Sequence, residues 1–292
     1  MTIREFQLER YFARWEFTAP YLLSASDCET VSVGELLNLA SVPLTELADL
    51  RLGYTESQGD PKLRTVIADF YSCVTPDDVV VTNAPEEAIF LAMLALLKPG
   101  DSVVVQTPCY QSLFELAKYQ GCDVRTWPMI ETDDGWRMDL DHLSSLVTED
   151  TRLLVVNFPH NPTGYLPTGS GFDAILDLAN GHGLWLFCDE MYRGLEYDVS
   201  DRLPSASDRY QRAVSLWGMS KTFGLAGLRI GWLATRDRQL VQSLLRLKDY
   251  TTICNSAPGE FLASVALQNA ETIIQRNLGI IQTNLAYVRE FM

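Results

Sequence analysis

Residues 213–232 read AVSLWGMSKTFGLAGLRIGW, and this stretch decides the fold and the chemistry that we expect of the chain. The apolar run 213–217 predicts a buried strand, and three glycines predict a loop before a second apolar run at 230–234. Lys221 therefore follows the end of a strand. A desolvated lysine is an amine nucleophile suited to a Schiff base, and the planar fork of Arg229 suits a phosphate. Taken alone, Lys221 and Arg229 are most simply explained as two solvated cations on a surface loop. Only the other motifs of the chain can favour a functional site over this explanation.

Length and composition bound the class of protein. With 292 residues, 47% of them apolar, the chain is long enough for one large domain or two. The longest apolar run, residues 88–97, is shorter than the roughly 18 to 20 residues that span a bilayer, so no membrane helix is expected. Charged residues interrupt the N-terminus, which excludes a signal-peptide core there and favours a cytoplasmic location.

Charge and cysteine content exclude further classes. A net charge of −15 argues against nucleic acid or an anionic membrane as a partner, because both require basic patches. The six cysteines include no C-x-x-C pair and there are only three histidines, so we expect free thiols and no metal site.

From residue 79 onward, short β-branched runs alternate with amphipathic segments, which is typical of a parallel α/β sheet with helical crossovers. Ligands of such sheets bind outside the carboxyl ends of the strands. Strands are expected at 79–82, 102–106, 122–127, 153–157, 184–189, 213–217 and 230–235, and helices at 86–97, 110–119, 172–180, 237–248 and within 260–291. Before them, a turn at 53–61 leads into a further helix, and residues 1–45 resemble an arm that packs on something larger.

Polar residues follow four of these strands. Asn83-Ala84-Pro85-Glu86 begins a helix, whose free N–H groups form a phosphate site, although every helix offers the same feature. Tyr110 follows the second strand, where its ring could stack on a flat heterocycle or be an ordinary packed tyrosine.

The other two strand ends carry an amide and an acid. Asn161 lies in a loop stiffened by prolines, which could aim its amide at a phenolate oxygen or be a plain turn. Asp189 ends an apolar strand, where a buried carboxylate needs a cation such as a protonated ring nitrogen, or is a satisfied structural acid. Together with Lys221 and Arg229, these groups meet the needs of one molecule, pyridoxal 5'-phosphate.

These residues resemble the fold type I, class I and II aminotransferases, which bind pyridoxal phosphate. The resemblance runs from about residue 53 to 235 and is most specific at Asn161-Pro162-Thr163-Gly164, Asp189-Glu190-x-Tyr192 and Ser220-Lys221 to Gly231. It implies a mostly parallel seven-stranded sheet between helices in a large domain at 46–280, preceded by an N-terminal arm at 1–45. Residues 281–292 would begin a C-terminal small domain that is truncated, without the arginine that usually binds the substrate carboxylate.

The resemblance also implies a role for each site residue. Lys221 forms the Schiff base and moves the Cα proton, Asp189 holds the pyridine nitrogen, and Asn161 with Tyr192 binds the phenolic oxygen. Tyr110 stacks on the ring, while the phosphate is held by Arg229, by the helix start at Ala84, Pro85 and Glu86, and by Tyr54 of a partner subunit. A homodimer with shared active sites, acting on an amino acid and a keto acid, is therefore expected.

The chain departs from the family at the phosphate site. Ala84-Pro85 replaces the usual Gly-Ala or Ser-Gly, which removes one N–H donor, and Gly218 replaces a frequent serine. We expect phosphate affinity to be weaker, or Tyr54 and Arg229 to carry more of it.

Three functions remain open. The first is amino transfer. The second is a lyase or cyclase reaction, because residues 158–160 and 249–252 resemble segments of capreomycidine synthase-like enzymes. The third is a truncated, catalytically impaired protein that binds pyridoxal phosphate.

Overall fold

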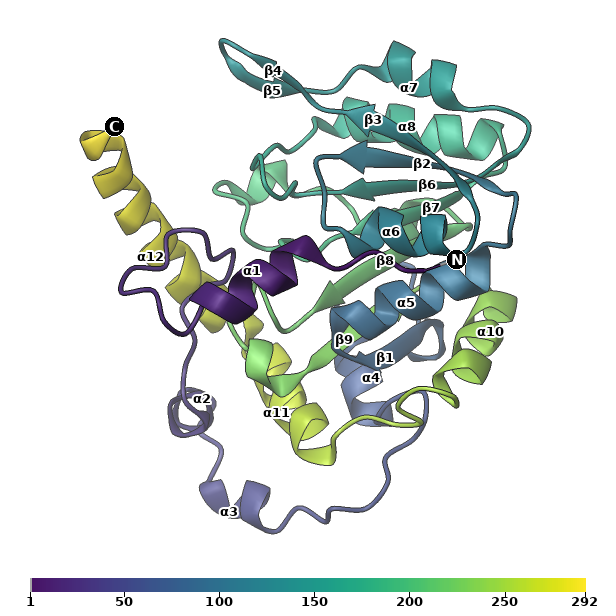
Figure 1. Ribbon diagram of the computed structural model, residues 1–292. Coiled ribbons are helices and arrows are strands. Elements are labelled where there is room, and N and C mark those ends of the chain that lie inside the picture. The colour runs from purple at the N-terminus through teal and green to yellow at the C-terminus, as the bar shows by residue number, and fades with distance from the viewer. Residues whose placement is uncertain (1) are drawn as a thin grey trace.

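The computed structural model describes residues 2–292, which form a seven-stranded sheet with helices on both of its faces (Figure 1). The strands lie in the order β1 (Val79–Asn83), β9 (Ile230–Ala234), β8 (Ala213–Gly218), β7 (Trp185–Asp189), β6 (Thr151–Asn157), β2 (Ser102–Thr107) and β3 (Asp123–Pro128). Only β9 pairs antiparallel, with β1 and with β8; the other ladders of this sheet are parallel. The predicted α/β class and mostly parallel sheet are therefore confirmed.

The sheet has an apolar core on each face because alternate residues of a strand point to opposite sides. In β2, Val103 and Val105 join one hydrophobic cluster, which includes side chains of α4, α5, α10, α11 and α12. Val104, between them, joins a second cluster with side chains of α7 and α8. The strands are buried on both faces; the edge strand β3 is the exception and is half exposed.

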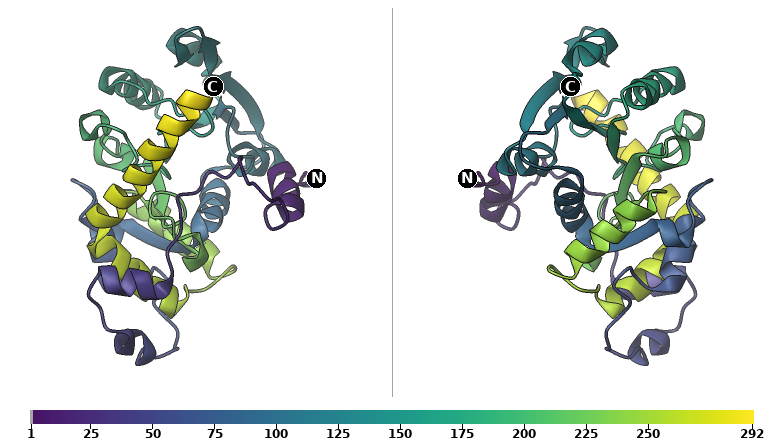
Figure 2. Two further views of the ribbon diagram at one scale, coloured as in Figure 1. Left: turned by 90° about the vertical axis from the view of Figure 1, so that its left-hand side faces the viewer. Right: turned by 90° about the vertical axis from the view of Figure 1, so that its right-hand side faces the viewer.

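Helices are present close to each predicted segment, and two further helices, at Leu140–Leu146 and Ala206–Arg209, were not predicted. Their bounds are α4 (Pro61–Ala68), α5 (Ala84–Leu96), α6 (Ser112–Tyr119), α7 (Leu140–Leu146), α8 (Gly169–Gly181), α9 (Ala206–Arg209), α10 (Arg238–Lys248), α11 (Ala257–Gln268) and α12 (Ala270–Phe291). Single 3-10 turns occur at η1 (Pro76–Asp78), η2 (Val199–Asp201) and η3 (Ala226–Leu228). The helical pattern expected over 260–291 is divided at Asn269, whose backbone lies outside the helical region. The last helix runs without interruption past residue 280, and its far end stands away from the sheet (Figure 2).

A small hairpin was missed by the sequence reasoning. β4 (Ile130–Thr132) and β5 (Gly135–Arg137) pair antiparallel in the segment that we expected to be a polar connection. Strands of this length are too short to show an alternating pattern, which explains the omission.

The N-terminal residues contain α1 (Gln7–Trp15), α2 (Val33–Leu39) and α3 (Leu44–Ala48). The first of these helices lies across the same side of the molecule as α6 (Figure 1). Leu36 and Leu37 of α2 are buried in the cluster that contains α11, so this part of the predicted arm packs into the main core. Among residues 2–292, no helix is both long and apolar enough to cross a bilayer.

Candidate functional site

A pocket of about 300 Å³ lies where β1, β2, β6, β7 and β8 end. Its volume falls in the range of small-molecule sites, and its position is the one that parallel sheets use for ligands. Most of the predicted site residues line it together: Pro85, Glu86, Tyr110, Asn161, Asp189, Tyr192, Lys221 and Arg229. Two predicted residues are not in this lining. Ala84 is buried beside it, and Tyr54 is 92% exposed on another surface.

Asp189 is the last residue of β7 and is 7% exposed. One carboxylate oxygen accepts the Met191 N–H at 3.1 Å, and no residue within 2–292 forms an ion pair with this carboxylate. Burial raises its pKa from 3.8 to about 7; the Met191 N–H and the charge of Lys221 oppose that shift. A cation placed beside this buried carboxylate in the pocket would stabilise its charged form.

Asn157 joins two of the predicted residues, and the sequence reasoning missed it. Its side-chain oxygen accepts the Asn161 N–H at 2.7 Å, and its side-chain nitrogen donates to the Asp189 carbonyl oxygen at 2.8 Å. Asn157 is itself buried, and its backbone N–H donates to the Gln106 side-chain oxygen on β2 at 2.9 Å. The only sequence signal was its position at the end of a strand.

The loop after β6 is held by His160. Its Nδ1 lies 2.7 Å from the Thr163 hydroxyl, and burial lowers the pKa of the ring to about 4, so the ring is neutral near pH 7. The Gly164 N–H donates to the His160 carbonyl oxygen at 2.7 Å and closes the turn around Asn161. The side chain of Asn161 is thereby presented to the pocket.

Tyr192 brings a buried hydroxyl to the same pocket. The hydroxyl forms no hydrogen bond of standard geometry with a described residue. Burial raises the pKa of the phenol, with Asp189 and Asp27 adding to the shift, while the Ser26 hydroxyl beside it lowers that pKa. Because a buried hydroxyl without a partner is costly, this group indicates a ligand atom.

The first turn of α5 forms another wall. The Ala84 N–H donates to the Arg229 carbonyl oxygen at 2.9 Å and Pro85 has no N–H, so Glu86 carries the first N–H of the helix that is free to meet an anion. Ala84 has a φ of 75° and Arg229 a φ of 53°, both in the left-handed region that favours glycine. The junction between β9 and α5 therefore holds two strained residues beside the pocket.

Glu86 is the acid of this wall. Its carboxylate accepts the Ser112 hydroxyl at 3.2 Å, and burial raises its pKa from 4.5 to about 7. The charge of Glu9 adds to that shift, while Arg229 opposes it. Arg229 itself is exposed at the pocket rim and donates to the Ala226 carbonyl oxygen at 2.9 Å.

Lys221 follows β8 by three residues, as predicted, but its surroundings differ from the expected apolar site. Its side chain is 28% exposed and forms an ion pair with Asp27 and a hydrogen bond of 3.1 Å to the Ser26 hydroxyl. These partners are some 195 residues earlier in the chain, and nothing in the pattern of residues 1–45 indicated them.

Tyr110 is also engaged by the N-terminal segment. Its hydroxyl donates to Glu9 at 2.8 Å, and the Phe6 ring lies 4.9 Å from its own ring at an angle of 49°. The Gln7 N–H donates to the Gln111 side chain at 3.0 Å next to it. The segment that contains α1 therefore covers one side of the pocket.

Comparison with known proteins assigns the family. The family model described as aminotransferase class I and II matches residues 36–292. The chain belongs to this family. Members of the family use pyridoxal 5'-phosphate as their cofactor, and this chain takes the same cofactor.

Two relatives in the class I and II aminotransferase family illustrate its range. Capreomycidine synthase of Streptomyces vinaceus is 35% identical over 286 residues, which cover 97% of this chain and 73% of that protein. A probable aspartate aminotransferase of Methanocaldococcus jannaschii is 25% identical over 268 residues, covering 87% and 70%.

Solved structures give the same picture. A pyridoxal-phosphate-dependent aminotransferase from Streptococcus suis superposes with a TM-score of 0.93 at 28% identity, covering 99% of this chain and 77% of that one. The pyridoxal-phosphate-dependent cyclase OrfR gives a TM-score of 0.90 at 32% identity, covering 100% and 76%. The chain is thus similar both to aminotransferases and to cyclases of this fold.

The pocket fits the family's cofactor. The partnerless Tyr192 hydroxyl suits the phenolic oxygen of the cofactor, and the Asp189 carboxylate without an ion pair suits a protonated ring nitrogen. An amine, Lys221, and an arginine, Arg229, line the same space. The donor set of the pocket therefore matches an aldehyde, a pyridine nitrogen, a phenol and a phosphate on one molecule.

Proposed function

We propose that this protein is a pyridoxal-phosphate-dependent aminotransferase that moves the amino group of an amino acid to a keto acid. The observation that carries the proposal is that the Lys221 amine and the Asp189 carboxylate line one pocket with the Tyr192 hydroxyl. The cofactor, when bound, supplies an aldehyde for the amine and a ring that withdraws electrons from the substrate Cα.

In this proposal each side chain has a specific task. Lys221 would hold the cofactor through its amine and, once the incoming amine had displaced it, would take the proton from the substrate Cα and deliver it to the cofactor's imine carbon. Asp189 keeps the ring nitrogen protonated. The positive ring nitrogen and the negative carboxylate stabilise each other, which offsets the burial that disfavours the charge of Asp189. Asn161 and Tyr192 donate to the phenolic oxygen, and Asn157 positions Asn161 through its backbone.

The phosphate is assigned to Arg229 and the start of α5. With the Ala84 N–H already bonded and Pro85 lacking one, the Glu86 N–H is the first donor that α5 offers. We therefore assign a large share of phosphate binding to the guanidinium of Arg229. The share would be smaller if the helix began with glycines, whose N–H groups could also bind the phosphate.

The second candidate is a lyase or cyclase reaction, which uses the same proton abstraction but ends in elimination or ring closure. It is favoured by the similarity to capreomycidine synthase over 97% of the chain and to the cyclase OrfR over all of it. Both reactions need Lys221, so the site alone is compatible with either.

The experiment is a half-reaction with purified holoenzyme and single amino acids. Amino transfer predicts that the cofactor accumulates in its pyridoxamine form while a keto acid appears. A cyclic or eliminated product without that form supports the second candidate instead. If the protein takes up the cofactor with an absorbance that borohydride removes, and yet turns over no amino acid, it is the impaired binder. Lys221→Ala must lose the borohydride-sensitive absorbance, or the role of Lys221 is wrong.

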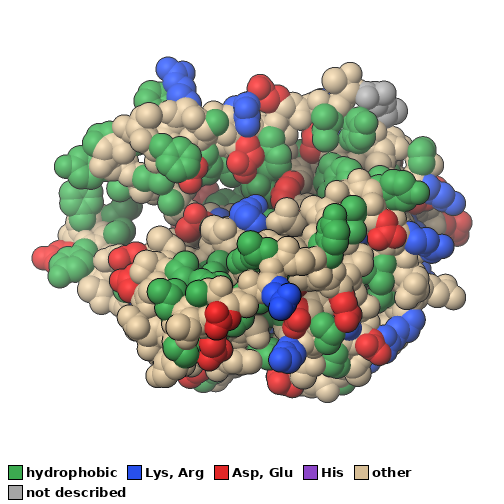
Figure 3. Space-filling view, turned by 90° about the horizontal axis from the view of Figure 1, so that it is seen from below, with side chains coloured by type: hydrophobic (Ala, Val, Ile, Leu, Met, Phe, Trp, Pro, Cys, Tyr) green, Lys and Arg blue, Asp and Glu red, His purple; other side chains and the backbone are tan. Residues whose placement is uncertain are grey.

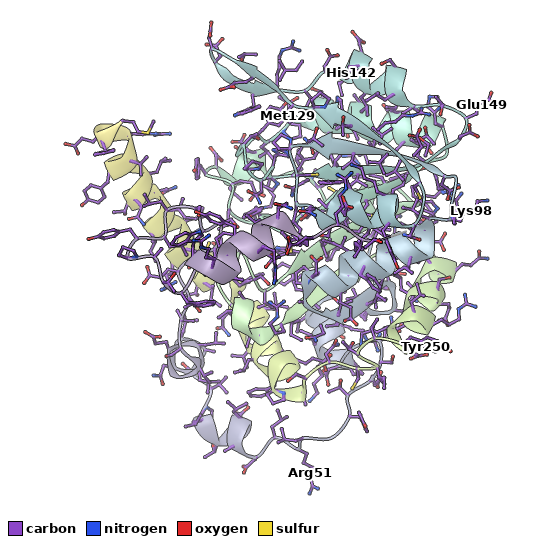
Figure 4. All side chains as sticks on the ribbon, in the orientation of Figure 1. Arg51, Lys98, Met129, His142, Glu149 and Tyr250 are labelled. Atoms are coloured by element: carbon purple, nitrogen blue, oxygen red, sulfur yellow. The ribbon has the colours of Figure 1, made fainter. Side chains whose placement is uncertain are left out.

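We also propose that two copies share their active sites. Tyr54, Tyr250 and Ile253 lie on adjoining loops that are joined by the bonds of Ser57 to Asp249 and to the Ile253 carbonyl oxygen (2.7 Å), and all three side chains are more than half exposed. Tyr250 projects from the lower part of the molecule (Figure 4), and the face seen from below carries hydrophobic side chains among charged ones (Figure 3). In a dimer formed through these loops, Tyr54 would reach the partner's phosphate.

Subunit mixing tests the shared site. Lys221→Ala and Tyr54→Ala homodimers are each expected to be weak, and mixing them should restore activity in one site per hybrid dimer. A monomer in sedimentation analysis, or no recovery on mixing, contradicts the proposal.

A further inference from the structure

The side of the pocket that the N-terminal segment covers is acidic. Glu9, Glu16 and Asp27 of that segment line the pocket, and Glu86 and Asp189 add two more carboxylates. The lining contains two cations, Lys221 and Arg229. The N-terminal part of the lining contributes these three carboxylates and no lysine or arginine, so this wall carries an excess of negative charge.

Asp27 already holds an ammonium group in this structure. The Nζ atom of Lys221 forms an ion pair with the Asp27 carboxylate and donates to the Ser26 hydroxyl at 3.1 Å. In the proposed function the Lys221 amine would hold the cofactor, so it would no longer be available as the cation partner of Asp27. A carboxylate that has lost its cation at the wall of a pocket favours the binding of another cation.

The neighbours of Asp27 place it beside the reacting end of the pocket. It lies close enough to Tyr192 to add to the raised pKa of that phenol, after burial and Asp189. Glu9 lines the same pocket, with its carboxylate held by the Tyr110 hydroxyl at 2.8 Å. A group bound to the cofactor at Lys221 therefore extends toward carboxylates.

We propose that Asp27, in the field of Glu9 and Glu16, selects amino acids whose side chain carries a positive charge, either an amine or a guanidinium. This inference rests on the proposed function, because it concerns the substrate of the same pocket. A substrate with an acidic side chain would find no cation to pair with. Arg229 is assigned to the phosphate, and the described lining offers no further arginine or lysine besides Lys221. Like charges across such a pocket disfavour binding.

The test compares amino acids of matched shape and different charge. Holoenzyme is titrated with arginine against citrulline, with lysine against norleucine, and with glutamate, and the half-saturating concentration is read from the change in cofactor absorbance. We expect roughly tenfold tighter binding of each cationic member, about the effect of one charged hydrogen bond. The preference should weaken with added salt because the wall is partly exposed.

Variants identify the group responsible. Asp27→Asn should remove the preference, Asp27→Glu should keep most of it, and Glu9→Gln or Glu16→Gln should reduce it. Glu149→Gln, on an exposed loop far from the pocket (Figure 4), should leave it unchanged. The readout is the ratio within each matched pair, which a general loss of folding or of cofactor does not change.

The outcomes separate this inference from the function on which it rests. If neutral and cationic members bind equally well, or if Asp27→Asn retains the preference, the assignment of Asp27 is overturned while the proposed function stands. If no amino acid changes the absorbance of cofactor-loaded protein, the proposed function fails and the inference fails with it.

Discussion

Pro85, which lines the pocket, and Gly218 lie so close together that a Cβ atom on residue 218 would lie 2.9 Å from the Pro85 Cγ. Gly231 on the neighbouring strand is under the same constraint, because its added Cβ would lie 2.6 Å from the Pro85 nitrogen. Distances this short require one of the partners to move. The sequence departs from the family pattern at both positions, with a proline at the helix start and a glycine before the lysine. The two departures are linked, because Pro85 leaves no room for a Cβ atom at residue 218.

This contact predicts a coupled stability effect. Gly218→Ala should lower the free energy of unfolding by about 1–3 kcal/mol through overpacking. Adding Pro85→Ala should recover part of the loss by removing the Cγ, but not all, since the Gly231 Cα and the Ile230 carbonyl oxygen also lie 3.0 Å from the new Cβ. Denaturant unfolding of both single variants and the double variant measures the coupling. Strict additivity of the two changes would argue against it.

Glu86 predicts a pH dependence of stability. Burial raises its pKa from 4.5 to about 7, so the folded protein holds this proton more tightly than the unfolded chain. The stabilisation is complete below pH 4.5 and is lost as the pH rises toward 7. Asp189 contributes with the same sign between 3.8 and about 7.

Comparison with Glu86→Gln isolates that contribution. The stability of the cofactor-free protein minus that of the variant should fall by on the order of 2 kcal/mol between acidic and neutral pH. Urea unfolding at several pH values measures the difference, with Glu149→Gln as the matched exposed control. A difference that does not change with pH would show that Glu86 titrates normally, and one that rises with pH would show that folding lowers its pKa.

Asn157→Ala tests the link between two predicted cofactor ligands. The substitution leaves the Asn161 N–H and the Asp189 carbonyl oxygen without their partners, which lie at 2.7 and 2.8 Å. We expect a loss of about 1–3 kcal/mol in stability. Cofactor affinity should fall as well, because both ligands lose their fixed positions. Fluorescence titration with the cofactor measures that fall; an unchanged dissociation constant would show that Asn157 acts on folding alone.

Tyr110→Phe tests how the N-terminal segment is held. It removes the 2.8 Å bond to Glu9 but keeps the ring beside Phe6. Because the bond is exposed, global stability should change by less than about 1 kcal/mol. The segment should nevertheless open more often, which trypsin cleavage after Arg10 and Arg14 would reveal. Cleavage at the wild-type rate would mean that the other contacts suffice.

Much of the fold follows from local sequence pattern. Each of the seven strands was predicted within two residues of its bounds, because parallel strands buried on both faces form unbroken β-branched runs separated by clear turn residues. The same order of strands brings Asn161, Asp189, Tyr192 and Lys221 to one edge, so their meeting in one pocket could be predicted from the chain alone. The short hairpin β4–β5 could not be predicted, since its strands are too short to show an alternating pattern of apolar and polar residues.

Other features depend on contacts between distant segments, for which a single sequence has no pattern. The ion pair of Lys221 with Asp27, the bond of Tyr110 to Glu9 and the bridge of Asn157 between Asn161 and Asp189 are of this kind. Sequence determined which groups stand at the strand ends, because strand and turn propensities are local. Tertiary structure decided which charges face them, because that depends on how residues 8–27 fold back over the pocket.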